Sequence, residues 1–103
     1  LRRSAQRSGL TQALGLMKDS ISHCPICGFG PFETPYRSTA EIRESFDICS
    51  CCGCEYGNDD NDRHFTEWVA GGCKWFTPKE RPQDWALDMQ LHQSIRPWPP
   101  AEA

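Results

Sequence analysis

The chain has 103 residues, of which 38% are hydrophobic and 24% charged, and its formal net charge is −3 at pH 7. This length predicts one domain with a small core, which excludes the large cleft of a big enzyme. No stretch approaches the roughly 20 apolar residues of a membrane span, and no secretion signal is apparent, so we expect a cytoplasmic protein whose seven cysteines are reduced.

The first predicted element is an N-terminal helix or arm over residues 1–22. Its apolar residues recur at steps of four, three and four: Leu10, Leu14, Met17 and Ile21. Such steps place the side chains on one face of a helix. The pattern indicates a terminal helix docked on the domain; the alternative is an amphipathic helix that binds a partner, such as a dimerisation arm.

Two cysteine pairs organise the middle of the chain. The first reads CPICG over residues 24–28, the second reads CSCCG over residues 49–53, and the 21 residues 28–48 lie between the pairs. A two-residue spacer lets both sulfurs of a pair face one point, and the glycine that follows permits positive φ. Four thiolates arranged in this way suit one tetrahedral zinc ion, and iron also accepts such a set. The predicted metal ligands are Cys24, Cys27, Cys49 and Cys52.

The second pair contains an ambiguity, because Cys51 and Cys54 form an overlapping C-x-x-C. We prefer the pair that Gly53 follows, since a glycine also follows the first pair. Cys51 and Cys54 are then expected as small buried or half-exposed thiols, and Cys73 as a buried one. A ligand exchange or a redox-sensitive pair at Cys51 and Cys54 is the alternative.

Short elements surround the two pairs. Residues 28–32 are rich in turn formers and predict a short hairpin, residues 40–44 predict a short turn of helix, and residues 45–49 alternate polar and apolar like a strand. A helix is expected to begin at Asp60, Asn61 or Asp62 and to end at residues 71–72.

A further helix is predicted from Asp84, with Leu87, Leu91 and Ile95 on one face and Pro97 as its end. The predicted fold is therefore a small α+β domain, with a zinc-ribbon-like or rubredoxin-like pair of knuckles, short β-hairpins and two or three packed helices. We place a single metal-stapled domain at residues 23–96 and a loose C-terminal tail at residues 97–103.

Acidic residues dominate the centre of the chain. Residues 41–67 contain two arginines and eight acids: Glu41, Glu44, Asp47, Glu55, Asp59, Asp60, Asp62 and Glu67. Such a surface repels a phosphate backbone and attracts a basic protein. The predicted partner-binding residues are Glu55, Tyr56, Asp59, Asp60, Asp62 and Trp68, with Tyr56 or Trp68 as the aromatic anchor.

Three stretches carry a family resemblance: SFDICSCCG over residues 45–53, the acidic NDD at residues 58–60, and the upstream CPICG. Through them, residues 23–76 resemble the cysteine-rich CPCC family of small bacterial proteins. The resemblance implies a zinc-ribbon or rubredoxin-like module and, as in some members, a role as a toxin-immunity protein. Two positions depart from the family pattern, with Ser50 in place of proline and Cys54 in place of an aromatic residue.

We therefore expect a structural zinc protein that binds a basic protein partner. A nucleic-acid-binding zinc ribbon is a second hypothesis, against which the acidic centre counts. A rubredoxin-like iron electron carrier is a third. An enzyme is the least favoured class, because four thiolates leave zinc no open position and His64 and His92 have no evident catalytic partners.

Overall fold

The structure of the protein is a computed structural model, and it describes residues 20–100. Most of the predicted N-terminal helix or arm at residues 1–22 lies outside the described residues. Ile21, which the helical pattern included, instead pairs with Tyr36 in an antiparallel β-bridge: its N–H donates to the Tyr36 carbonyl at 2.7 Å and its carbonyl accepts at 3.0 Å. Ile21 itself is buried, so this start of the described chain packs on the core.

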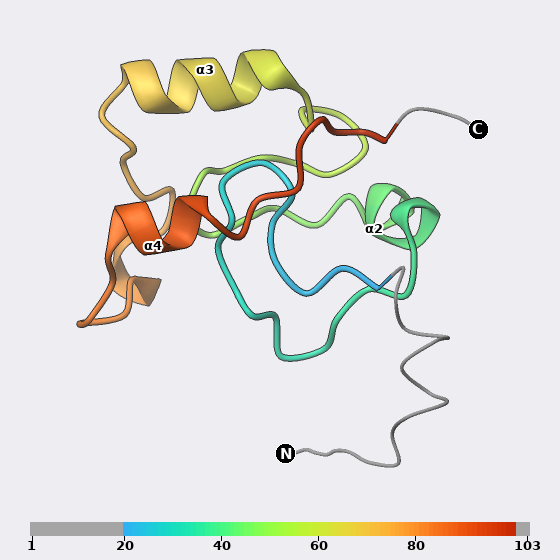
Figure 1. The fold of residues 1–103 in the computed structure, drawn as a ribbon, viewed down its shortest axis with the longest axis horizontal. Helices are drawn as coiled ribbons and strands as arrows, with labels where there is room; N and C mark the ends of the chain where they lie inside the picture. The colour runs from blue at the N-terminus through green and yellow to red at the C-terminus, as the bar shows by residue number, and fades with distance from the viewer. Residues whose placement is uncertain (1–19, 101–103) are drawn as a thin grey trace.

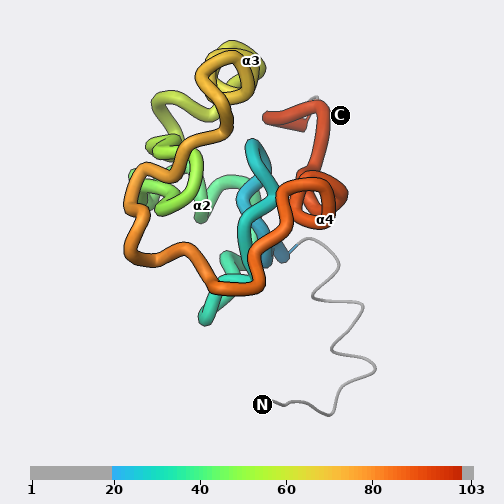
Figure 2. The backbone as a smooth tube through the Cα atoms, turned by 90° about the vertical axis from the view of Figure 1, so that its left-hand side faces the viewer, coloured from blue at the N-terminus to red at the C-terminus, as the bar shows by residue number. Residues whose placement is uncertain are grey.

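Three α-helices and one short 3-10 helix form among residues 20–100: α2 over Thr39–Ser45, α3 over Asp62–Ala70, η1 over Pro78–Glu80 and α4 over Leu87–Leu91. They lie around a centre made of loops rather than of a sheet (Figures 1 and 2). The first cysteine pair is on the central loop that precedes α2, and the second is on the loop between α2 and α3. None of these helices is long and apolar enough to cross a membrane.

The predicted β-hairpins are absent from residues 20–100, where pairing is limited to two isolated bridges, Ile21 with Tyr36 and Ile48 with Glu55. The strand predicted at residues 45–49 fails for a local reason. Phe46 ends α2 in the left-handed conformation, with φ at 55°, which interrupts an extended chain. Phe46 and Ile48 are consequently exposed instead of facing the core.

The helix ends follow local side-chain chemistry. Ser38 caps α2 by accepting a hydrogen bond from the Glu41 N–H at 3.0 Å, and Asn61 caps α3 by accepting from the His64 N–H at 2.9 Å. Asn61 is thus the cap among the three candidates that the sequence offered. Helix α3 ends at Gly71, as predicted, and buries Trp68 on its inner face.

Helix α4 is shorter than predicted, because it begins three residues after Asp84 and ends at Leu91. The chain then continues in turns. The Gln93 N–H donates to the Gln90 carbonyl at 2.9 Å, and the Ser94 hydroxyl donates to the Leu91 carbonyl at 3.1 Å. Leu87 and Leu91 still pack on the core, whereas Ile95 is exposed.

Sulfur makes up much of the core. Six cysteines are among its thirteen buried residues. The full set is Ile21, Cys24, Ile26, Cys27, Ile42, Cys49, Cys51, Cys52, Cys54, Tyr56, Trp68, Trp75 and Trp98. Trp98 lies in the stretch predicted as a loose tail, but it is only 4% exposed. The core therefore continues beyond the predicted boundary at residue 96. Because cysteines form so much of the core, an interaction that joins the cysteines also stabilises the core.

Candidate metal centre

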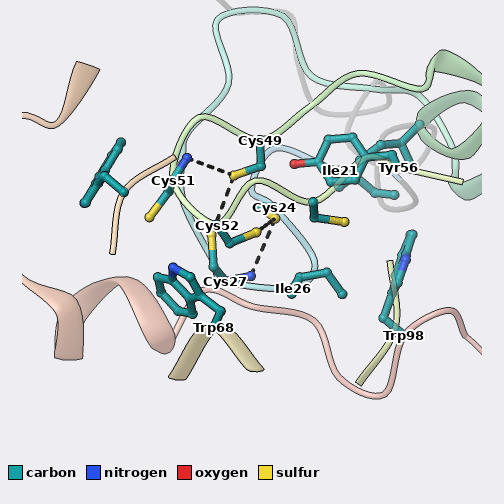
Figure 3. Close-up of a cluster of buried hydrophobic side chains, with 13 residues drawn as sticks. Ile21, Cys24, Ile26, Cys27, Cys49, Cys51, Cys52, Tyr56, Trp68 and Trp98 are labelled. Carbon is teal, nitrogen blue, oxygen red and sulfur yellow. Dashed lines mark hydrogen bonds between the residues drawn. The ribbon is translucent and has the colours of Figure 1, made fainter. Parts of the chain in front are cut away.

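The four predicted ligands converge at the centre of the fold. The sulfur atoms of Cys24, Cys27, Cys49 and Cys52 all lie within 4.8 Å of one another, and all four residues are buried. Across the two pairs, the Cys24 and Cys52 sulfurs are 3.9 Å apart and the Cys27 and Cys49 sulfurs 3.7 Å apart. Figure 3 shows the four side chains pointing toward one another from the two loops.

These distances fit a metal ion rather than disulfides. A tetrahedral zinc ion with Zn–S bonds of about 2.3 Å places its sulfurs roughly 3.8 Å apart. A disulfide requires sulfurs about 2.05 Å apart, and every cysteine of the described chain is free. Four clustered thiolates also need a cation, because buried negative charges without compensation are costly.

Both loops use the same turn. The Gly28 N–H donates to the Cys24 carbonyl at 2.8 Å, and the Gly53 N–H donates to the Cys49 carbonyl at 2.9 Å. The two glycines have φ of 89° and 78°, as the trailing-glycine pattern predicted. Backbone N–H groups also reach the sulfurs: the Cys27 N–H donates to the Cys24 sulfur at 3.5 Å, and the Cys51 N–H to the Cys49 sulfur at 3.4 Å. These donors stabilise thiolate charge.

The electrostatics of the cluster are unequal between its members. Burial raises the pKa of the Cys24 thiol. The pKa of Cys49 is instead lowered, because hydrogen bonds from the Cys24, Cys27 and Cys52 thiols stabilise its thiolate. A divalent ion would displace the thiol protons and be held by four thiolates.

The remaining three cysteines lie outside the four-sulfur group. Cys51 and Cys54 are fully buried, and Cys73 is half-buried rather than buried as predicted. Gln90 of α4 donates one hydrogen bond to the Cys51 sulfur at 3.3 Å and one to the Cys27 carbonyl at 3.1 Å. Sequence reasoning missed Gln90, although it lies three residues after Leu87, on the face of the helix that was predicted to be buried.

Three of the six predicted partner-binding residues belong to the core. Tyr56, Asp60 and Trp68 are buried, so the prediction that they lie on a docking surface is wrong. The Asp60 carboxylate accepts hydrogen bonds from Arg43 Nε and from Trp98 Nε1, each at 2.8 Å. Asp60 lies in an acidic run, which predicts an exposed position. Its two partners are distant in sequence, so the local pattern does not reveal them.

The other three predicted residues remain at least partly accessible. Glu55 and Asp59 are half-buried, and the Asp59 carboxylate accepts from the Glu55 N–H at 3.4 Å. Asp62 is exposed and forms an ion pair with Arg96 at 2.5 Å.

His64, for which the sequence offered no catalytic partner, has a structural contact instead. It is half-buried, and its Nε2 lies 2.9 Å from the Cys52 carbonyl oxygen. This contact connects α3 to the second cysteine loop.

The comparisons with known proteins give two distant similarities. The chain is 28% identical over 81 residues to the uncharacterized protein YozI of Bacillus subtilis, an alignment that covers 59% of this chain and 67% of YozI. It is 32% identical over 79 residues to protein JOKA2 of Solanum tuberosum, covering 75% of this chain but 8% of JOKA2. No family model matches the chain, and no solved structure matches it.

Proposed function

We propose that this protein is a structural zinc-binding module that docks on a basic protein partner. The observation that carries the proposal is the group of four buried sulfurs at the spacing of a tetrahedral metal site. With all four coordination positions supplied by the chain, zinc has no position for a water or a substrate. Its role is then to stabilise the fold, and the protein acts through its surface rather than as an enzyme.

The metal test uses the purified protein. We expect one zinc ion per chain by elemental analysis, and loss of secondary structure by circular dichroism when a strong chelator removes it, since structural zinc contributes on the order of 10 kcal/mol to folding. Iron fits the same four sulfurs, and absorption separates the two metals because an iron form is red and a zinc form colourless. A protein that keeps its spectrum and melting temperature without metal would contradict the structural role.

A groove beside α2 supports the partner half of the proposal. It is an open surface hollow that runs along the loop of residues 32–38 and the outer side of α2. Its charged lining is Glu33, Arg37, Glu41, Glu44 and Asp47, and Phe32, Pro35 and Tyr36 add apolar surface. Arg37 is paired with Glu41 at 3.1 Å, which leaves the negative charges of Glu33, Glu44 and Asp47 uncompensated in the groove. Such a groove favours a basic segment of a partner.

The resemblance to the CPCC family suggests what kind of partner this is. We propose a bacterial toxin, with this protein as the immunity protein that neutralises it. The acidic groove suits that role, because a toxin that acts on nucleic acid needs a basic surface.

The partner test needs charge-matched variants. Once a partner has co-purified and been identified, its affinity is measured for two double variants. The first, Glu33→Lys plus Glu44→Lys, changes two exposed groove residues. The second, Asp84→Lys plus Asp88→Lys, changes two exposed residues near α4. We expect the groove pair to weaken binding at least tenfold and the α4 pair to change it little. Equal effects of the two pairs would show that net charge, not this groove, selects the partner.

A further inference from the structure

The Tyr56 hydroxyl is a buried polar group that the described residues leave unsatisfied. The residue is 2% exposed, and its hydroxyl has no hydrogen-bond partner among them. A buried O–H group without a partner is unfavourable, because it has lost its hydrogen bonds to water. Such a group in a core calls for an acceptor.

The surrounding structure holds the tyrosine firmly in place. Its N–H donates to the Asp47 carbonyl at 3.0 Å, which anchors the backbone next to the bridge between Ile48 and Glu55. Its ring packs edge-on against the Tyr36 ring, with centroids 6.3 Å apart. This placement leaves the hydroxyl directed at the sulfur cluster, as Figure 3 shows.

The sulfurs are the acceptors available in that direction. Among these sulfurs, the charges of Cys24 and Cys49 act most strongly on the Tyr56 hydroxyl, with Cys24 first. Four thiolates around one divalent ion carry a net negative charge and accept hydrogen bonds. The Cys24 and Cys49 sulfurs each already accept from one backbone N–H, which leaves room for a further donor.

We propose that the Tyr56 hydroxyl donates a hydrogen bond to the metal-bound thiolate of Cys24, and so positions and tunes this ligand. The inference rests on the proposed metal site. Metal binding turns a thiol, which is a weak acceptor, into a thiolate, which is a strong one. The hydroxyl that lacks a partner is thereby satisfied when the four cysteines are loaded, and Tyr56 contributes to metal retention although it does not touch the ion.

The test compares Tyr56→Phe with Tyr36→Phe. Each variant removes one hydroxyl and keeps the ring, but the Tyr36 hydroxyl donates to the Asp47 carboxylate instead. Zinc affinity is measured by competition with a chelator, and the cobalt-loaded protein reports thiolate donor strength through its sulfur-to-metal charge-transfer band. We expect Tyr56→Phe to weaken zinc binding about tenfold, the lower end of the effect of groups that orient metal ligands. Its charge-transfer band should move to lower energy, because the thiolate loses a hydrogen bond.

The wild-type protein and the control separate the outcomes. Tyr36→Phe should leave both the zinc affinity and the cobalt spectrum unchanged. If Tyr56→Phe binds zinc like the wild type with an unshifted band, or if both variants shift equally, the hydrogen bond is refuted while the metal site stands. If the wild-type protein binds no metal, the proposed function fails as well.

Discussion

Replacing Asp60 tests whether this carboxylate supports the core or binds a partner. The side chain is 2% exposed and accepts from Arg43 and from the indole of Trp98, residues that lie 17 and 38 positions away in sequence. A hydrogen bond to a charged group is worth roughly 1.5–3 kcal/mol. The Arg43 side chain is 40% exposed, so water compensates part of its loss and we assign this contact only about 1 kcal/mol.

The hydrogen bond from the Trp98 indole contributes the remaining free energy of unfolding. In Asp60→Ala the buried indole N–H is left without a partner, which costs about 2 kcal/mol. The sum, about 3 kcal/mol, lowers the melting temperature by roughly 10–20 °C in a domain of this size. Asp60→Asn keeps an acceptor for the indole and loses the charge, so it should lose only about a third of that stability.

The assay is thermal unfolding of the metal-loaded protein, followed by circular dichroism. Asp84→Ala is the matched control, because Asp84 is exposed and forms no hydrogen bond or ion pair within residues 20–100. Its melting temperature should stay within about 3 °C of the wild type. If Asp60→Ala melts together with Asp84→Ala, the buried network contributes no stability and the reasoning is refuted.

Three further predictions concern the cysteine loops. Cys27→Ser should lose the metal and fail to fold, whereas Cys73→Ser should retain one ion per chain by elemental analysis; metal loss from both would contradict the four-sulfur assignment. Gly28→Ala should cost about 3 kcal/mol or more, since φ is 89° and an added Cβ would lie 2.1 Å from the Gln90 carbonyl oxygen. Gly71→Ala, with its nearest contact at 3.3 Å, is the tolerated comparison in thermal melts. Metal should be released, and stability lost, as the pH falls, because burial raises the pKa of the Cys24 thiol and protons then compete with the ion. An indicator dye that detects no release between about pH 8 and pH 4 would contradict this direction.

Features set by near neighbours were predictable from the sequence. The trailing glycines required positive φ, and Gly28 and Gly53 adopt it. Asn61 caps α3 through its own side chain, and Gly71 ends the helix. Each of these depends on groups within a few residues, so the local sequence contains the necessary chemistry. The two-residue spacers likewise identified the four sulfurs, although the meeting of the two pairs joins residues 22 and 28 positions apart.

Local patterns failed where a longer-range contact or a competing local conformation prevailed. The alternation at residues 45–49 predicted a strand, but the left-handed Phe46 at the end of α2 interrupts it. Ile21, the last residue of the predicted helical stripe, instead pairs with Tyr36 in a β-bridge. Periodicity reports which conformations suit a segment, and neighbouring elements then select among them.

Burial was decided only by the tertiary structure. The acidic run that contains Asp60 predicts an exposed surface. In the structure, however, the Trp98 indole N–H donates to the Asp60 carboxylate inside the core. Gln90 reaches Cys27 from 63 residues away, and the Tyr56 hydroxyl faces sulfurs from two separate loops. Sequence proximity determines turns, caps and ligand spacing, because those interactions are local. Which polar groups are enclosed depends on contacts between distant segments, and these exist only once the chain has closed around the cysteines.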